Sequence, residues 1–199
     1  MKATRLEAYS DAVIAIIITI MVLELHVPEE ASLAALAEVL PTFLAYVLSF
    51  IYLSIYWNNH HHLLHACDRI NGRAMWANIH LLFWLSLVPF STAWLSQNPG
   101  TALTSAVYGI NLFMAGLAYY LLTRSLKPIH EPDSRLNSMT ASATKEHAST
   151  ALYLAAIGAS LLGWVAAAYA LYVLVALMWV IPDRRYEALL QTLMTRSPK

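Results

Sequence analysis

Residues 8–25 read AYSDAVIAIIITIMVLEL. This run is apolar apart from Asp11 near its start and Glu24 near its end. A helix needs about 20 such residues to cross the hydrocarbon core of a bilayer. The run lacks turn residues, which favours a helix over a strand in lipid. Lys2 and Arg5 before it are also typical of a signal peptide. Asp11 and the lack of a small-residue cleavage site after Leu23 favour a retained transmembrane helix.

The composition of the whole chain supports a membrane protein. Hydrophobic residues make up 59% of it and charged residues 12%, whereas soluble domains have about 45–50% and about 25%. Lipid solvates apolar side chains that a soluble protein of this size could not bury. The net charge is zero, which gives no support to a nucleic-acid partner. The single cysteine, Cys67, excludes an intramolecular disulfide and a cysteine-cluster metal site.

We predict one all-α transmembrane domain over residues 1–199. Its six helices are expected at about residues 8–26, 40–64, 75–95, 102–122, 146–162 and 165–182. Pro41 is expected in the first turn of the second helix, where proline is tolerated. Residues 148–181 carry no charge, and as one helix they would be about 50 Å long, too long for a core of about 30 Å. Two short helices with a turn near residues 160–164 fit better.

The basic residues support this count. With six spans, every lysine and arginine falls on one side of the membrane: Lys2, Arg5, Arg69, Arg73, Arg124, Lys127, Arg135, Lys145, Arg184, Arg185, Arg196 and Lys199. The positive-inside rule places this side, with both termini, in the cytoplasm. We therefore expect a multi-pass plasma-membrane protein that works within the membrane as a channel, a carrier or an intramembrane enzyme.

Three polar residues stand at the cytoplasmic end of the first helix: Arg5, Ser10 and Asp11. An ionisable group at membrane depth is costly unless it is paired or lies in a wet cavity. Arg5 and Asp11 are six positions apart and do not share a helix face, so each is expected to pair with another helix or another subunit. The alternative is that Arg5 only marks the interface and that Asp11 reaches back to it.

Farther along the same helix, Ile16, Ile20 and Leu23 form one stripe, with Thr19 beside it. Spacing alone favours ordinary packing for this stripe, with the Thr19 hydroxyl bonded to its own backbone.

The second helix ends in a histidine cluster. His61 and His65 are four apart, as helical metal ligands often are, and His80 lies on the next span. No acidic residue lies in the same turn, so a polar helix end packed under its neighbours is favoured over a metal site. The groups that could hydrogen-bond to Ser10 or Asp11 are Asn59, His61 and Asn78.

Several motifs are missing from the sequence. It has no His-Glu-x-x-His, no Gly-x-Ser-x-Gly and no phosphate-binding glycine loop. The carbonyl filter Thr-Val-Gly-Tyr-Gly is absent too, so an ion filter here would have to consist of side chains.

Two motifs together suggest a family. Residues 5–11, Arg-Leu-Glu-Ala-Tyr-Ser-Asp, resemble the Arg-x-x-x-Phe-Ser-Asp signature of the transmembrane protein 175 family, the lysosomal and prokaryotic potassium channels, with Tyr9 keeping the aromatic ring. Residues 57–61, Trp-Asn-Asn-His-His, resemble the family's Trp-x-x-His-His at the end of helix two. Asn78 and Pro89-Phe90 resemble positions in helix three, and the resemblance covers the whole chain.

The resemblance implies a homotetramer of six-helix subunits in which helix one lines a central pore. It places the constriction at Ile16, Ile20 and Leu23 and implicates Thr19 in potassium preference, which reverses the packing interpretation of the stripe. The residues that would tie the helices together behind the pore are Arg5, Tyr9, Ser10, Asp11, Trp57, His61 and Asn78. The chain would then be a passive, potassium-preferring cation channel and no enzyme, with K⁺ as permeant ion and without cofactor or metal.

Two other functions stay open at this point. The first is a small proton-coupled carrier with Asp11 and the histidines as a relay. The second is a membrane metalloenzyme that uses His61, His65 and His80.

Overall fold

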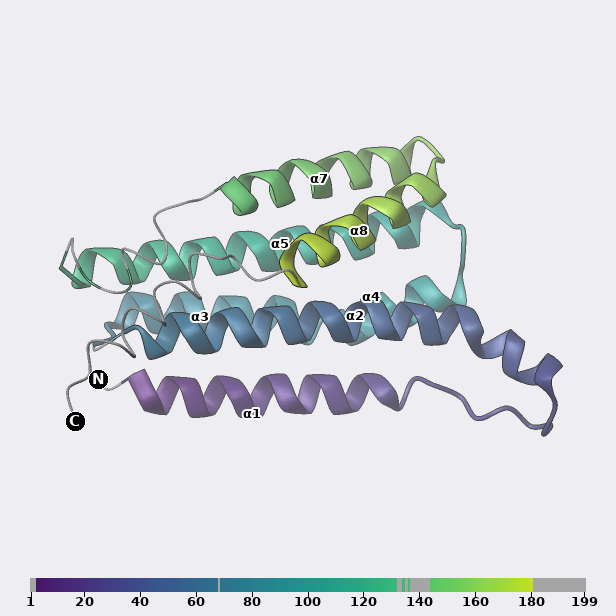
Figure 1. The fold of residues 1–199 in the computed structure, drawn as a ribbon, viewed down its shortest axis with the longest axis horizontal. Helices are drawn as coiled ribbons and strands as arrows, with labels where there is room; N and C mark the ends of the chain where they lie inside the picture. The colour runs from purple at the N-terminus through teal and green to yellow at the C-terminus, as the bar shows by residue number, and fades with distance from the viewer. Residues whose placement is uncertain (1–2, 68, 132–133, 135, 137–143, 181–199) are drawn as a thin grey trace, which may run out of the picture.

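The computed structural model describes residues 3–67, 69–131, 134, 136 and 144–180, and every regular element in them is a helix (Figure 1). These elements are α1 (Ala3–Val22), α2 (Leu33–His65), α3 (Gly72–Ser86), α4 (Val88–Gln97), α5 (Ala102–Leu126), the short 3₁₀ helix η1 (Lys127–Ile129), α7 (Thr144–Leu161) and α8 (Val165–Val180). Because α3 and α4 follow each other as one interrupted span, the described helices form six spans, as predicted. The end of the predicted sixth span, residues 181–182, lies outside the described residues, as do Lys2, Arg135 and the C-terminal basic residues.

The second helix begins earlier than predicted. Ser32 caps it, with its Oγ accepting a hydrogen bond from the Ala35 backbone N–H at 3.1 Å, so α2 starts at Leu33 rather than near residue 40. The expectation that Pro41 lies in the first turn is therefore wrong, because Pro41 lies inside the helix. Proline cannot donate to the carbonyl one turn back and its ring crowds that turn. Figure 1 shows the N-terminal part of α2 bent away from the rest.

The predicted third span is interrupted in the middle. α3 ends at Ser86 and α4 begins at Val88, with Pro89 in the first turn of α4. Pro89 has no N–H to continue the hydrogen bonding of α3, which accounts for the break at Leu87.

The predicted reversal between the last two helices is confirmed. Gly163 has a positive φ of 83°, a conformation that glycine adopts without steric cost. The Trp164 N–H donates to the Ala159 carbonyl oxygen at 2.8 Å, which closes the end of α7 in the manner of a Schellman motif. The chain can therefore turn within a few residues and run α8 back along α7.

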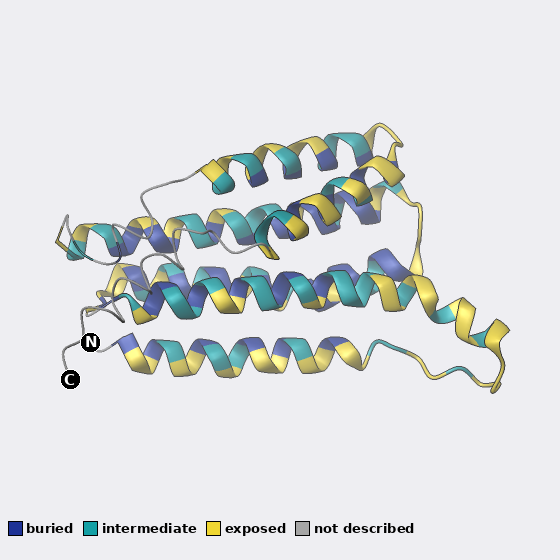
Figure 2. Cartoon of the chain, in the orientation of Figure 1, coloured by how far each residue is buried: buried dark blue, intermediate teal, exposed yellow. Residues whose placement is uncertain are grey.

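The helices are arranged with α1 and α7 on opposite sides of the bundle (Figure 1). α1 packs against α2, α3 and α4, whereas α7 packs against α5 and α8. Within the described residues, three segments are long and apolar enough to cross a membrane: Leu33–His65, Gly72–Gln97 and Ala102–Ile129. α8 is a shorter apolar helix. Figure 2 shows exposed residues along one side of α1, whose other side is buried against its neighbours.

Candidate functional site

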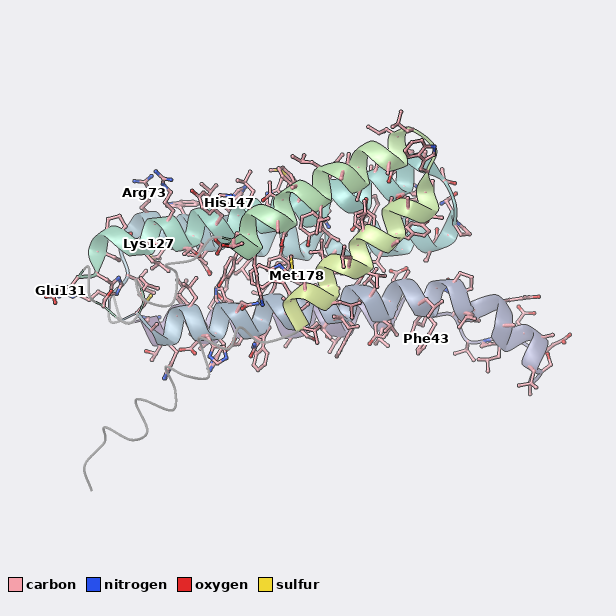
Figure 3. All side chains as sticks on the ribbon, turned by 45° about the horizontal axis from the view of Figure 1, so that its top comes forward. Phe43, Arg73, Lys127, Glu131, His147 and Met178 are labelled. Atoms are coloured by element: carbon pink, nitrogen blue, oxygen red, sulfur yellow. The ribbon has the colours of Figure 1, made fainter. Side chains whose placement is uncertain are left out.

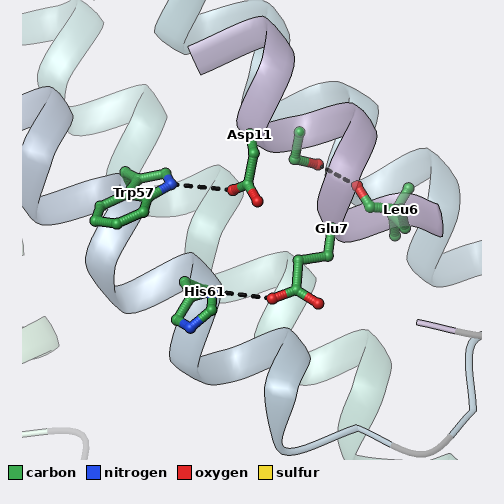
Figure 4. Close-up of polar contacts among 6 residues, drawn as sticks. Leu6, Glu7, Asp11, Trp57 and His61 are labelled. Carbon is green, nitrogen blue, oxygen red and sulfur yellow. Dashed lines mark hydrogen bonds and ion pairs between the residues drawn. The ribbon is translucent and has the colours of Figure 1, made fainter. Parts of the chain in front are cut away.

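Two side-chain contacts join the first two helices near the N-terminal end of α1 (Figure 4). Trp57 Nε1 donates to Asp11 Oδ1 at 3.0 Å, and His61 Nδ1 lies 2.9 Å from Glu7 Oε1. Glu7 and Asp11 are four apart on α1, and Trp57 and His61 are four apart on α2, so each pair shares one face of its helix. The result is a two-step ladder between antiparallel helices.

The rings on the α2 side of this ladder are stacked. The His61 ring lies between the rings of Trp57 and His65, with centroids 6.0 Å and 5.9 Å away and interplanar angles of 23° and 16°. Stacking restricts how these rings can turn. The indole N–H and the imidazole nitrogen are therefore held in position toward the two carboxylates of α1.

A second set of contacts is fully buried and joins three helices. Asn78 on α3 donates through Nδ2 to Ser10 Oγ on α1 at 2.9 Å, and the Ser10 hydroxyl donates to the Leu6 carbonyl oxygen at 2.8 Å. Asn78 Oδ1 lies 2.6 Å from Nε2 of His60 on α2. Since an amide oxygen only accepts, the His60 proton resides on Nε2.

Because these contacts are buried, breaking them would destabilise the packing of α1. The side chains of Ser10, His60 and Asn78 are all 0% exposed. A polar group without a partner is costly in a low-dielectric interior. Rotation of α1 about its axis would separate Ser10 from Asn78, so the contacts fix which face of α1 points outward.

The sequence suggested part of this arrangement. The pairings of Asn78 with Ser10 and of Trp57 with Asp11 are present. His61, however, contacts Glu7 rather than Ser10 or Asp11, and Asn59 donates to the Ile55 carbonyl within its own helix.

Two residues of the site were missed, Glu7 and His60. A signal for Glu7 existed, because it precedes Asp11 by four positions and so lies on the same face. His60 falls on the buried stripe of α2 that contains Tyr52, Leu53, Tyr56 and Leu63, which a helical period would have indicated.

The opposite face of α1 is exposed in the subunit. Ile16, Ile20 and Leu23 are 57%, 47% and 78% exposed, whereas Ile14 and Ile17 are 1% and 5% exposed. α1 ends at Val22 rather than at residue 26, so Leu23 lies in the turn that follows and not in the helix. We call Tyr9, Ile16, Thr19, Ile20 and Leu23 the exposed face of α1.

Two further features accompany this face. The Thr19 hydroxyl donates to the Ile16 carbonyl oxygen at 2.9 Å. A groove of about 710 Å³ runs between α1 and α4 and is lined mainly by apolar side chains, among them Ile16, Ile20, Phe90 and Trp94. The exposed face therefore continues into a concave apolar surface.

The remaining candidate residues do not come together within the subunit. Arg5 is exposed and has no hydrogen-bond or ion-pair partner among the described residues. His80 accepts a hydrogen bond from Trp84 Nε1 at 2.9 Å on its own helix. In the described part of the chain, no three His, Cys, Asp or Glu side chains are close enough to hold a metal ion, so the proposed set of His61, His65 and His80 is not assembled there.

Comparison with known proteins adds a second line of evidence. The family model described as "Endosomal/lysosomal potassium channel TMEM175" matches residues 5–89, the segment that holds the ladder between α1 and α2 and the buried contacts of Ser10, His60 and Asn78. A potassium channel of Chryseobacterium sp. (strain P1-3) is 48% identical over 187 residues, which cover 94% of this chain and 97% of that protein. A potassium channel of Streptomyces collinus is 32% identical over 153 residues, which cover 72% of this chain and 74% of that protein.

A solved structure is similar over most of its length. The crystal structure of a lysosomal potassium-selective channel TMEM175 homolog from Chamaesiphon minutus superposes with a TM-score of 0.75 at 26% sequence identity. The superposition covers 89% of this chain and 96% of that chain.

Proposed function

This chain belongs to the TMEM175 family of potassium channels, and we propose that four copies of it form a potassium-preferring channel whose pore is lined by α1. It is a multi-pass membrane protein and not an enzyme. The proposal covers the tetramer, the pore residues and the orientation in the membrane.

The observation that carries the proposal is the division of α1 into two faces. The ladder to α2 and the buried contacts to Asn78 hold one face against the subunit. The other face presents Ile16, Ile20 and Leu23 outward, beside the apolar groove along α4. Four such faces around an axis would form a pore wall, and the neighbouring subunit would cover the groove. Arg5, exposed at the start of α1, would find its partner in that subunit.

An apolar constriction implies a particular mode of conduction. A ring of four isoleucine side chains offers water no hydrogen bonds, so the ring can empty and close or widen and pass a partly hydrated ion. Apolar side chains cannot replace a hydration shell as carbonyl oxygens do, so selectivity for K⁺ would be modest. The Thr19 hydroxyl would supply the polar contact beside the constriction. Ions would move passively along their electrochemical gradient.

The distribution of basic residues supports the proposed orientation in the membrane. Arg69, Arg73, Arg124, Lys127 and Lys145 lie in or near the connections at one end of the helical bundle. The positive-inside rule assigns that end to the cytoplasm, which puts the N-terminus of α1 there too. For a chain with bacterial relatives, the membrane would be the plasma membrane.

The test is ion flux through the purified protein in liposomes, together with its oligomeric state in detergent by light scattering. We expect K⁺ flux above Na⁺ flux without a second substrate, and a mass of four subunits. Potassium movement only in the presence of a proton gradient would support the carrier alternative with Asp11 and the histidines. A monomer with full flux would refute the shared pore.

A further inference from the structure

A second cavity lies on the side of the bundle away from α1. It has a volume of about 290 Å³ and lies between α2, α5, α7 and α8. This is close to the lower end of the range of roughly 300–1,000 Å³ for small-molecule sites. With α1 at the centre of a tetramer, the side that carries α7 would face lipid (Figure 1).

Tyrosine, phenylalanine and tryptophan make up much of the cavity wall. They are seven of its fifteen lining residues: Tyr52, Tyr56, Phe113, Tyr119, Tyr120, Tyr153 and Trp179. Several of their polar atoms are already bonded within the protein. The Tyr56 hydroxyl donates to the Leu112 carbonyl at 3.4 Å, the Tyr119 hydroxyl to the Asn59 carbonyl at 3.2 Å, and Trp179 Nε1 to Ser149 Oγ at 2.7 Å. The rings therefore offer apolar surface to an occupant.

Gly116 contributes to the opening of the cavity. It lines the wall on α5, where a Cβ would lie 3.6 Å from Tyr56 Oη and 3.9 Å from Tyr153 Cε2, which are ordinary contacts. A larger side chain at this position would project among the aromatic rings. The absence of a side chain at Gly116 therefore leaves part of the space free.

Two basic side chains contact aromatic lining residues at the end of the cavity near Glu146, which we call its mouth. Lys145 Nζ lies over the ring of Trp179, 5.9 Å from its centroid, and the Arg124 guanidinium donates to Tyr120 Oη at 3.0 Å. Both Trp179 and Tyr120 line the cavity. Glu146 is the one carboxylate among the lining residues.

The Glu146 carboxylate interacts with basic neighbours. Lys127 and His147 interact with it electrostatically. Figure 3 shows Lys127 and His147 toward the end of the bundle opposite to Phe43, where Glu131 also lies. The mouth therefore combines one carboxylate with three permanent cations, those of Arg124, Lys127 and Lys145.

We propose that this cavity binds an acyl chain of an anionic phospholipid, with the phosphate at the mouth near Lys145 and Arg124. Basic pockets between transmembrane helices bind anionic headgroups in this way. The lining is mostly aromatic and aliphatic, and its further polar members are Asn59, His147, Ser149 and Thr150. Such walls fit a hydrocarbon chain better than a free phosphate ion. An organic ammonium ion would be attracted to the rings and to Glu146, but the excess of positive charge at the mouth disfavours it.

The test uses the purified full-length protein, stripped of lipid and then offered equal amounts of dioleoyl phosphatidylglycerol and dioleoyl phosphatidylcholine, with bound lipid counted by native mass spectrometry. We expect phosphatidylglycerol to be retained in preference. Gly116→Leu should abolish this retention. Gly158→Leu is the matched control, because a Cβ there has no neighbour within 4 Å, and it should bind as the wild type does. Equal retention in wild type and Gly116→Leu would overturn the proposal.

A charge variant tests the headgroup without altering the cavity wall. Lys145→Gln should lower the preference for phosphatidylglycerol about fivefold, the effect of one basic residue near an anionic membrane surface, and leave phosphatidylcholine binding unchanged. Displacement by millimolar inorganic phosphate would mean that free phosphate is the ligand. Stronger displacement by dodecyltrimethylammonium than by dodecyl phosphate would mean that the site takes a cation. Either displacement result contradicts a lipid anion.

Discussion

The two halves of α1 differ in the contacts that their side chains make within the subunit. In residues 3–11, Glu7, Ser10 and Asp11 each contact a side chain of α2 or α3. In residues 12–23, the exposed side chains are apolar except for Thr19, whose hydroxyl bonds to its own helix. In the first half these three side chains find partners within the subunit, although Arg5 has none among the described residues, whereas the second half presents a surface that its own subunit does not cover. Polar contacts thus set the rotation of the helix, and the apolar half carries the proposed function.

The largest effect is expected from breaking the buried contacts of the first half. Asn78→Leu keeps the size of the side chain but removes the amide, so that His60 Nε2 and Ser10 Oγ each lose a hydrogen bond. Each buried polar atom left without a partner costs about 1–3 kcal/mol, so we expect little folded tetramer and a melting temperature many degrees lower. Size-exclusion chromatography with thermal unfolding in detergent measures both.

The matched control for this change is Asn58→Leu, because Asn58 is exposed on α2. It should leave yield and melting temperature close to those of the wild type. If Asn78→Leu behaves like Asn58→Leu, the buried contacts do not hold α1 in place.

A large gain in current is expected from wetting the second half. Ile16→Asn places a polar group of similar size on the exposed face, where it would hydrate the constriction. We expect potassium currents several-fold larger, with more leakage of other monovalent cations, in bilayer recordings. The same change at Ile17, which is 5% exposed, should instead impair packing and expression. Larger currents from Ile17→Asn and wild-type currents from Ile16→Asn would mean that the pore face is wrong by one position.

A smaller effect should distinguish the two steps of the ladder. Asp11→Ala removes a charged acceptor from Trp57 Nε1; because Trp57 is 44% exposed, we expect a loss at the low end of the range of about 1.5–3 kcal/mol for hydrogen bonds to charged groups. Glu7→Ala removes a partly exposed contact with His61, and such pairs contribute about 0–1 kcal/mol. Tetramer yield and current should therefore fall more in Asp11→Ala. Normal assembly and current in Asp11→Ala would contradict the anchoring role.

The smallest effect concerns selectivity. Thr19→Val keeps the shape of the side chain and removes the hydroxyl that would lie beside the proposed constriction. We expect conduction to persist while the potassium-to-sodium permeability ratio, measured from reversal potentials, falls toward one. An unchanged ratio would exclude the hydroxyl from selectivity.

The spans were predictable from the sequence because a transmembrane helix needs about 20 predominantly apolar residues. The uncharged run of residues 148–181 is too long for one helix, and Gly163 supplies the turn. The start of α2 was harder, because proline is tolerated in the first turn of a helix and Pro41 therefore suggested a start near residue 40. The alanine and leucine content of residues 33–40 favours a helix nonetheless, and Ser32 is a typical N-cap.

The candidate site was predictable only in part. Polar and charged side chains in lipid need partners, so the sequence identified Ser10 and Asp11 as members of the site. Which histidine reaches which partner depends on the rotation and depth of α2 against α1, and residue spacing along one helix does not contain that information. His60 and Glu7 became part of the site only when three helices were placed together.

The central claim, that the exposed face of α1 lines the pore, is tested most directly by cysteine accessibility. The single native cysteine, Cys67, is buried, so an introduced thiol can be read alone. Ile16→Cys and Ile17→Cys proteins in liposomes would be treated with a charged, water-soluble methanethiosulfonate reagent while potassium flux is followed. We expect the reagent to block flux through Ile16→Cys and to leave Ile17→Cys unaffected. Persistent flux through a treated Ile16→Cys channel, with block of Ile17→Cys, would contradict it.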